Sequence, residues 1–114
     1  MDEAFGQTWC RGMSPVAKYF VVHSYIKDPA TTWSFFGQGA PGLAKEMAAG
    51  KTPAKCLMTW NPWAHGRGEH VFCLWEANNP QDIDIVLKDS GMAEYISSDI
   101  MAVDEIDWAH LARG

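Results

Sequence analysis

The sequence predicts an α+β domain in which one four-stranded antiparallel sheet carries two helices on the same face. Two observations predict this class. Four segments rich in β-branched and aromatic residues alternate with two segments that carry helix-start signals, in the order β-α-β-β-α-β. The chain has 114 residues, of which 47% are hydrophobic, as expected for one globular domain. We expect a single domain over 1–114, with 1–16 as an N-terminal arm and 104–114 as a C-terminal extension.

The four strands are predicted from apolar runs bounded by turn residues. The first covers 18–27 (KYFVVHSYIK) and the second 55–61 (KCLMTWN). The third, 69–77 (EHVFCLWEA), follows the connection PWAHGRG, and the fourth covers 94–103 (EYISSDIMAV). Glycines in the connection can adopt positive φ, which suits a tight turn between strands two and three.

The two helices are predicted from their ends. The first starts at Asp28 and Pro29, a capping residue followed by a proline suited to the first turn, and it extends to about Ala49. We expect an interruption at 37–42 (GQGAPG). The second helix, within 79–91, starts with a capping Asn, a Pro and an acid, and ends at a Gly. With right-handed crossovers, this order gives the ferredoxin-like fold.

The segment 37–42 also matches the pattern GxGxxG. A dinucleotide-binding loop needs a preceding strand and a following helix N-terminus, whereas here a helical segment precedes it and Pro41 lies inside it. We therefore interpret the glycines as a break in the helix that could form the mouth of a pocket.

Charge and composition exclude several partners. The net charge is −5 and the sequence has no Lys/Arg cluster, so we expect that the protein does not bind nucleic acid. We also expect no membrane, since a basic amphipathic helix and a long apolar run are both missing. The N-terminus does not resemble a signal peptide, so a cytoplasmic location is expected. Cys10, Cys56 and Cys73 have no CxxC spacing and fit a reducing compartment, the last two as small buried hydrophobes rather than nucleophiles.

Alternation along the strands divides the sheet into two faces. We assign to the helix side Phe20, Val22, Ser24, Ile26, Cys56, Met58, Trp60, Val71, Cys73, Trp75, Ile96, Ser98 and Ile100. The open side then holds Tyr19, Val21, His23, Tyr25, Leu57, Thr59, Asn61, His70, Phe72, Leu74, Glu76, Tyr95, Ser97, Asp99 and Met101. An open face of roughly 400 Å² that is this apolar is unusual on a monomer. The sequence therefore predicts a homodimer formed through the open sheet face.

The sequence F-C-L-W-E-A at 72–77, followed by a helix and then the spaced residues G…I…V..I, resembles the dimeric α+β-barrel ferredoxin-like superfamily. The resemblance covers about 18–107 and is architectural. Members of this superfamily include cofactor-independent monooxygenases, haem-degrading monooxygenases, muconolactone isomerase-like enzymes and small-ligand binders. The resemblance implies a site between the helices and the sheet or inside the dimer barrel. It transfers no catalytic residue to this chain.

The candidate chemical groups are His23, Glu76 and Asp99, which alternation places together on the open face. Because strand one should lie between strands three and four, these side chains could approach one another. An imidazole held by a carboxylate is a usable general base near neutral pH. The alternatives are a buried pair that only satisfies its own hydrogen bonds, or a Glu76 in water at the strand end.

Aromatic residues supply the candidate ligand site. We expect it to contain Tyr25, Trp33, Phe36, Asn61, Trp63 and Phe72. Tyr25, His23 or Asn61 would anchor the polar end of the ligand, although core packing explains any single Trp equally well. No cofactor or metal is expected, since His65 and His70 are too few for a ligand set. The sequence thus predicts a dimer that binds a small apolar or amphipathic metabolite; the alternatives are a cofactor-independent monooxygenase or isomerase and a purely structural dimer.

Overall fold

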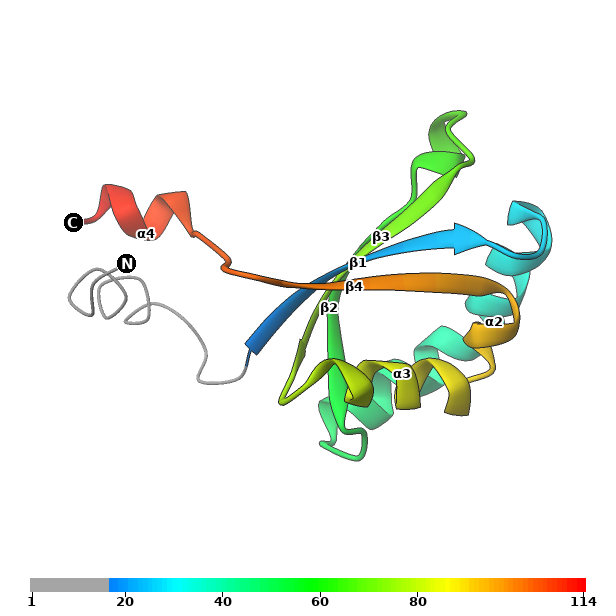
Figure 1. Ribbon diagram of the computed structural model, residues 1–114, viewed down its shortest axis with the longest axis horizontal. Helices are drawn as coiled ribbons and strands as arrows, with labels where there is room; N and C mark the ends of the chain where they lie inside the picture. Colours follow the sequence, from blue (N-terminus) through cyan, green and yellow to red (C-terminus); the bar gives the residue numbers. More distant parts are fainter. Residues whose placement is uncertain (1–16) are drawn as a thin grey trace.

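The sheet is the organising element of the structure, a computed structural model that describes residues 17–114 (Figure 1). Its four strands are antiparallel and lie in the order β2-β3-β1-β4. The predicted position of the first strand between the third and fourth is therefore confirmed. The predicted arm 1–16 and Cys10 lie outside the described residues. The elements are β1 (Ala17–Tyr25), α2 (Pro29–Ala48), β2 (Ala54–Trp60), η1 (Pro62–His65), β3 (His70–Ala77), α3 (Pro80–Asp89), η2 (Met92–Glu94), β4 (Ile96–Val103) and α4 (Trp108–Ala112).

Helices α2 and α3 lie on one face of this sheet, as predicted (Figure 1). Helix α3 begins where the Asn79 side chain accepts a hydrogen bond from the Asp82 amide at 3.1 Å. Its apolar stripe, Ile83, Val86 and Leu87, is buried against the sheet. A capped helix with one apolar side is stable only when that side is covered, so this stripe fixes α3 on the strands.

Helix α2 corrects one prediction, because it runs unbroken through 37–42 with Pro41 inside it. The Asp28 carboxylate caps its first turn by accepting from the Thr31 amide at 2.9 Å. Glycine costs about 1 kcal/mol per interior position, and proline costs more. Packing overrides this cost, since Trp33 and Leu43 on either side of the segment contact the core. Local helix propensity therefore predicts a break at 37–42, but tertiary packing keeps the helix continuous.

The pairing of β1 with β3 corrects the predicted faces of β1. Val21 stands opposite Cys73 and His23 stands opposite Val71, so these residues share the side of the sheet that faces the helices. Phe20 and Val22 therefore point to the other side. Both alternating sets of β1 are mostly apolar, so alternation alone could not choose between them.

A β-bulge in β2 corrects a second set of faces. The pairing shifts between Cys56 and Met58, and beyond it Thr59 stands opposite Cys73 while Trp60 stands opposite Phe72. One extra residue reverses the alternation of everything that follows it. Thr59 therefore joins Cys56 on the helix side, while Met58 and Trp60, predicted on that side, lie on the open side.

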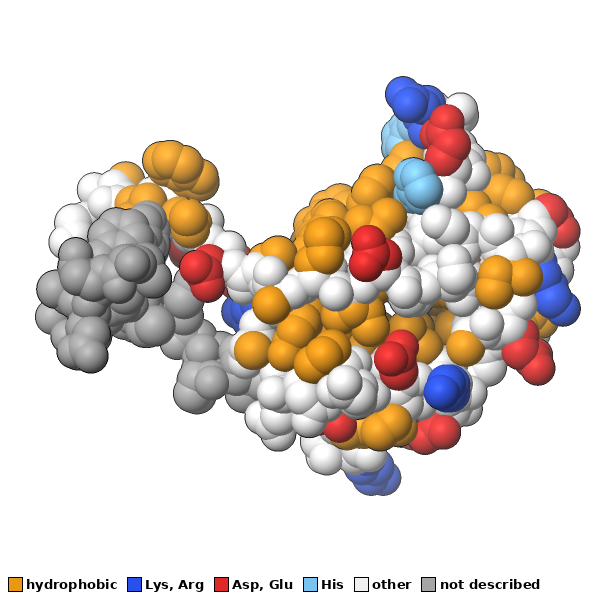
Figure 2. All heavy atoms as spheres, viewed as in Figure 1, with side chains coloured by type: hydrophobic (Ala, Val, Ile, Leu, Met, Phe, Trp, Pro, Cys, Tyr) orange, Lys and Arg blue, Asp and Glu red, His pale blue; other side chains and the backbone are white. Residues whose placement is uncertain are grey.

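The strand pairings define two faces of the sheet, the helix face and the open face. The helix face carries Tyr19, Val21, His23, Tyr25, Ala54, Cys56, Thr59, Val71, Cys73, Trp75, Ala77, Ile96, Ser98, Ile100 and Ala102. The open face carries Lys18, Phe20, Val22, Ser24, Met58, Trp60, His70, Phe72, Leu74, Glu76, Ser97, Asp99, Met101 and Val103. Figure 2 shows hydrophobic side chains gathered along both sides of the strands.

The predicted extension 104–114 contains helix α4, which the Asp107 carboxylate caps by accepting from the amides of the next turn. Figure 1 shows α4 standing apart from the strands and from α2 and α3. Trp108 at its start is 78% exposed. A salt bridge of 2.8 Å between Lys18 and Glu105 joins the start of this segment to β1. Within 17–114, none of the helices combines the length and apolarity that a membrane crossing demands.

Candidate functional site

A cavity of about 380 Å³ lies between the helix face and helices α2 and α3. Its size falls within the range of small-ligand pockets. Helix α2 lines it with residues that include Trp33, Phe36 and Ala40, which recur at helical spacing on one side. The sheet contributes His23, Cys56, Thr59, Val71, Cys73 and Trp75. The cavity is therefore a mainly apolar chamber with a few polar groups on its sheet wall.

His23 is the most buried polar group of the sheet wall, with 1% of its surface exposed. Its Nδ1 lies 2.7 Å from the Ser98 hydroxyl, and Nε2 makes no hydrogen bond within the described part of the chain. Burial lowers the pKa of His23 from 6.5 to about 4, so the ring is neutral at neutral pH. A neutral imidazole offers one donor and one acceptor, and a hydroxyl can complement either. His23 can therefore offer one hydrogen bond, as donor or acceptor, to a molecule in the cavity.

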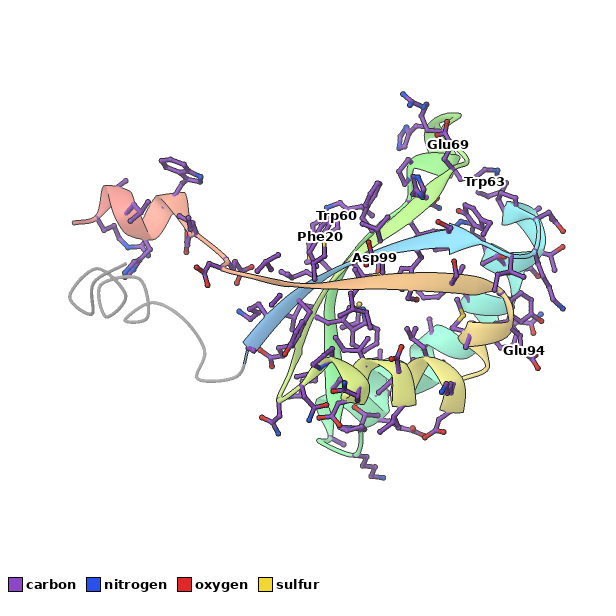
Figure 3. All side chains as sticks on the ribbon, in the orientation of Figure 1. Phe20, Trp60, Trp63, Glu69, Glu94 and Asp99 are labelled. Atoms are coloured by element: carbon purple, nitrogen blue, oxygen red, sulfur yellow. The ribbon has the colours of Figure 1, made fainter. Side chains whose placement is uncertain are left out.

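The predicted approach of His23 to Glu76 and Asp99 is wrong. Asp99 stands opposite Val22, and Glu76 stands opposite Lys18, so both carboxylates lie on the open face while His23 faces the cavity. Figure 3 shows Asp99 on the far side of the sheet from α2 and α3. Glu76 is half-buried between Lys18 on β1 and Lys55 on β2, where opposite charges across strands are favourable. Neither of the two predicted carboxylates is therefore near His23.

Three of the predicted ligand-site residues, Tyr25, Trp33 and Phe36, contact one another beside the cavity. The Trp33 indole Nε1–H donates to the Tyr25 hydroxyl at 2.7 Å. Phe36 packs edge-on against Trp33, with ring centroids 5.1 Å apart. Trp33 and Phe36 line the cavity, while Tyr25 supports Trp33 from behind. These aromatics form one wall whose orientation is set by a hydrogen bond.

The other three predicted ligand-site residues lie outside the cavity. Phe72 is on the open face, stacked on Phe20 with ring centroids 5.9 Å apart. Asn61 follows β2, and its side-chain oxygen is buried without a hydrogen-bond partner among residues 17–114. Trp63 lies in η1, 38% exposed, and Figure 3 places it in the projecting β2–β3 connection. Of the six predicted ligand-site residues, only Trp33 and Phe36 therefore line the cavity.

A thiol pair in the cavity was missed in the sequence. Thr59 places its hydroxyl 3.4 Å from the Cys56 sulfur and 3.3 Å from the Cys73 sulfur. The neighbouring Cys73 thiol lowers the pKa of Cys56 to about 7, while the same interaction and burial raise the pKa of Cys73. The bulge between Cys56 and Met58 creates this cluster, and 16 residues lie between the two cysteines in the sequence. No signal in the letters alone could have shown it.

The two histidines of the β2–β3 connection do not form a metal set. His70 lies on the open face, where its Nδ1 is 3.3 Å from the Ser24 hydroxyl, and His65 ends η1. Within residues 17–114, no group of three or more His, Cys, Asp or Glu side chains could hold a metal ion.

Comparison with known proteins identifies no relative of this chain. The chain matches no protein-family model, no curated protein sequence and no solved structure. The protein has a small α+β fold with a four-stranded antiparallel sheet.

The buried neutral His23 predicts a specific dependence of stability on pH. Between pH 6.5 and about 4 the unfolded chain binds a proton at this position that the folded chain does not, so stability falls as the pH falls. From pH 7 to pH 5 the wild type should lose about 2 kcal/mol more than the His23→Gln variant. Urea unfolding at both pH values measures this difference.

The exposed His70 supplies the matched control for this measurement, since a His70→Gln variant should keep the pH dependence of the wild type. Equal pH dependence of wild type and His23→Gln would show that His23 titrates normally and is not buried as described.

Proposed function

We propose that this protein is a homodimer whose subunits each bind a small apolar or amphipathic metabolite in the cavity beneath α2 and α3. The observation that carries the proposal is a largely apolar chamber with one neutral, hydrogen-bonding imidazole on its wall. Pockets that bind small metabolites combine apolar lining with a few placed polar groups. The ligand is therefore expected to carry an apolar or aromatic body and one hydroxyl or carbonyl group that meets His23.

Binding is favoured over acid–base catalysis by the surroundings of His23. A base with a pKa of about 4 removes protons weakly at neutral pH, and among residues 17–114 its ring is hydrogen-bonded to one side chain, the Ser98 hydroxyl. The two carboxylates suggested as its partners lie across the sheet. The same neutral ring is well suited to hold a hydroxyl or carbonyl group, because it needs no counter-charge in an apolar chamber.

The proposal of a homodimer rests on the open face. Phe20 stacks on Phe72 and lies 6.2 Å from Trp60, ring centroid to centroid, which makes a continuous aromatic surface. Trp60 is 44% exposed and Met58 is 54% exposed on this face. Figure 3 shows Phe20 and Trp60 projecting from the sheet away from the helices. A second copy would bring a surface of identical chemistry, as a two-fold interface requires.

The order β2-β3-β1-β4, with α2 and α3 on one face, supports assignment to the ferredoxin-like fold. Packing of two open faces would then give the dimeric α+β barrel that the sequence resembles. The cavity lies on the opposite side of the sheet, so ligand binding and dimer formation would use separate surfaces.

Ligand binding is tested by filling the cavity. Isothermal titration calorimetry with 2-naphthol should give saturable binding near one molecule per chain and a negative heat-capacity change, because apolar surface is buried. Ala40 lines the cavity, so Ala40→Phe should weaken binding by about tenfold or more. Ala49 is exposed at the end of α2 and outside the cavity, so Ala49→Phe should leave affinity unchanged.

Two results would contradict the binding proposal. One is the absence of saturable binding to the folded wild type. The other is equal weakening by Ala40→Phe and Ala49→Phe, which would place the 2-naphthol site outside the cavity.

The dimer is tested by a charge on the open face. Light scattering of the wild type should give twice the 12.7 kDa mass of the chain. Trp60→Glu should give the single-chain mass, since an unpaired carboxylate at an apolar interface is costly. Ile85 on α3 is also 44% exposed, so Ile85→Glu is a control of equal exposure and should remain dimeric. A monomeric wild type at micromolar concentration would refute the dimer.

A further inference from the structure

The thiol pair of the cavity differs from an ordinary pair of core cysteines. Cys56 lines the cavity and is only half-buried, whereas Cys73 beside it is 6% exposed. The Cys56 sulfur has two polar neighbours besides Cys73, since it lies 3.4 Å from the Thr59 hydroxyl and 3.5 Å from the Met58 carbonyl oxygen. A structural cysteine in a core usually has apolar neighbours and no access to a ligand.

The bulge of β2 builds this arrangement. Without the extra residue, Cys56, Met58 and Trp60 would share one face and Thr59 would point to the other. With it, Thr59 stands opposite Cys73 and can contact both sulfurs. Bulges commonly re-aim side chains next to functional sites. Here the bulge directs a hydroxyl onto two thiols at the wall of an apolar chamber.

We propose that Cys56 is a nucleophilic thiol that the cavity presents to apolar α,β-unsaturated carbonyl compounds, with Cys73 and Thr59 as positioning residues. This inference rests on the proposed function and narrows its ligand class, because the aromatic wall of Trp33 and Phe36 would hold the apolar body. In the reaction, a lone pair of the Cys56 sulfur forms a bond to the β carbon. The carbon–carbon π pair shifts to the bond between the α carbon and the carbonyl carbon, and the carbonyl π pair moves onto oxygen, which gives an enolate. Water takes the proton that the thiol loses and supplies a proton to the α carbon, and the carbonyl double bond re-forms.

The electrostatics of the pair agree with this role. A thiolate is the reactive form, and the Cys73 thiol lowers the pKa of Cys56 to about 7 by stabilising that form. Burial and the neighbouring Cys56 raise the pKa of Cys73, so this thiol keeps its proton and remains a donor. The Thr59 hydroxyl, 3.4 Å from the Cys56 sulfur, can donate a second hydrogen bond to the thiolate. No histidine or lysine is required to activate Cys56 in this arrangement.

The test is alkylation of the folded protein with N-phenylmaleimide, read by tryptic mapping. Cleavage after Lys55 and Arg67 places Cys56 and Cys73 on separate peptides, 56–67 and 68–88, and Cys10 on a third. The rate at Cys56 should rise with pH and reach half its maximum near pH 7. In the urea-unfolded chain the midpoint of this pH dependence should lie at about 8.5, which is the ordinary pKa of a cysteine thiol.

Variants separate a positioning role from simple packing. Cys73→Ala removes the donor, so the midpoint at Cys56 should rise by about one pH unit, while Cys73→Ser keeps a donor and should stay near the wild type. Cys56→Ser should abolish labelling of peptide 56–67. A midpoint for the folded wild type equal to that of the unfolded chain, or an equal effect of both Cys73 variants, would overturn the inference.

The choice of reagent tests the ligand class. For each reagent, the rate at Cys56 in the folded protein is divided by its rate in the unfolded chain. This ratio should be at least about tenfold larger for N-phenylmaleimide than for the charged N-carboxymethylmaleimide, since the cavity is apolar. Equal relative rates would refute the preference for apolar electrophiles. The saturated analogue N-phenylsuccinimide, which cannot react, measures binding alone. If N-phenylsuccinimide binds but N-phenylmaleimide does not alkylate Cys56 rapidly, Cys56 is not a nucleophile and the binding proposal stands. If alkylation is fast but N-phenylsuccinimide does not bind, the binding proposal is refuted.

Discussion

The register between β1 and β3 is the constraint on which the site depends. With Val21 opposite Cys73, His23 faces the helices and Phe20 faces away from them. A shift of one residue would exchange every side chain of β1 between the two faces. It would place the aromatic ring of Phe20 in the cavity and the imidazole on the open face. The buried, neutral His23 and the aromatic open surface are thus two consequences of one pairing.

The cavity exists because helix α2 and the bulged strand β2 line it in part with small side chains. Helix α2 lines the cavity with Ala40, where a larger side chain would fill the space, and the sheet wall includes the small residues Thr59 and Cys73. Interiors are normally packed to the density of organic crystals, and empty apolar volume lowers stability. A chamber lined in this way has a shape that a small apolar molecule can complete.

The sequence was sufficient for the elements and their order, because caps and β-rich runs are local signals. It was insufficient for the faces of β1, since Phe20 and Val21 are both apolar, and for β2, since a bulge leaves no mark in the letters. The continuity of α2 through Pro41 depends on tertiary packing that propensity does not include. Trp33 and Phe36, which the sequence suggested for a ligand site, line the cavity, whereas the cluster around Cys56 exists only through long-range pairing.

The most direct test of ligand binding in the cavity is NMR of the protein with ¹⁵N-labelled histidine side chains during titration with 2-naphthol. The chain has four histidines, and only His23 lies at the cavity; the other three are exposed. Binding in the cavity should shift the signals of the His23 ring nitrogens saturably and leave those of His65, His70 and His110 unchanged. Shifts at His70 on the open face with none at His23 would contradict it, because they would place the ligand on the opposite side of the sheet.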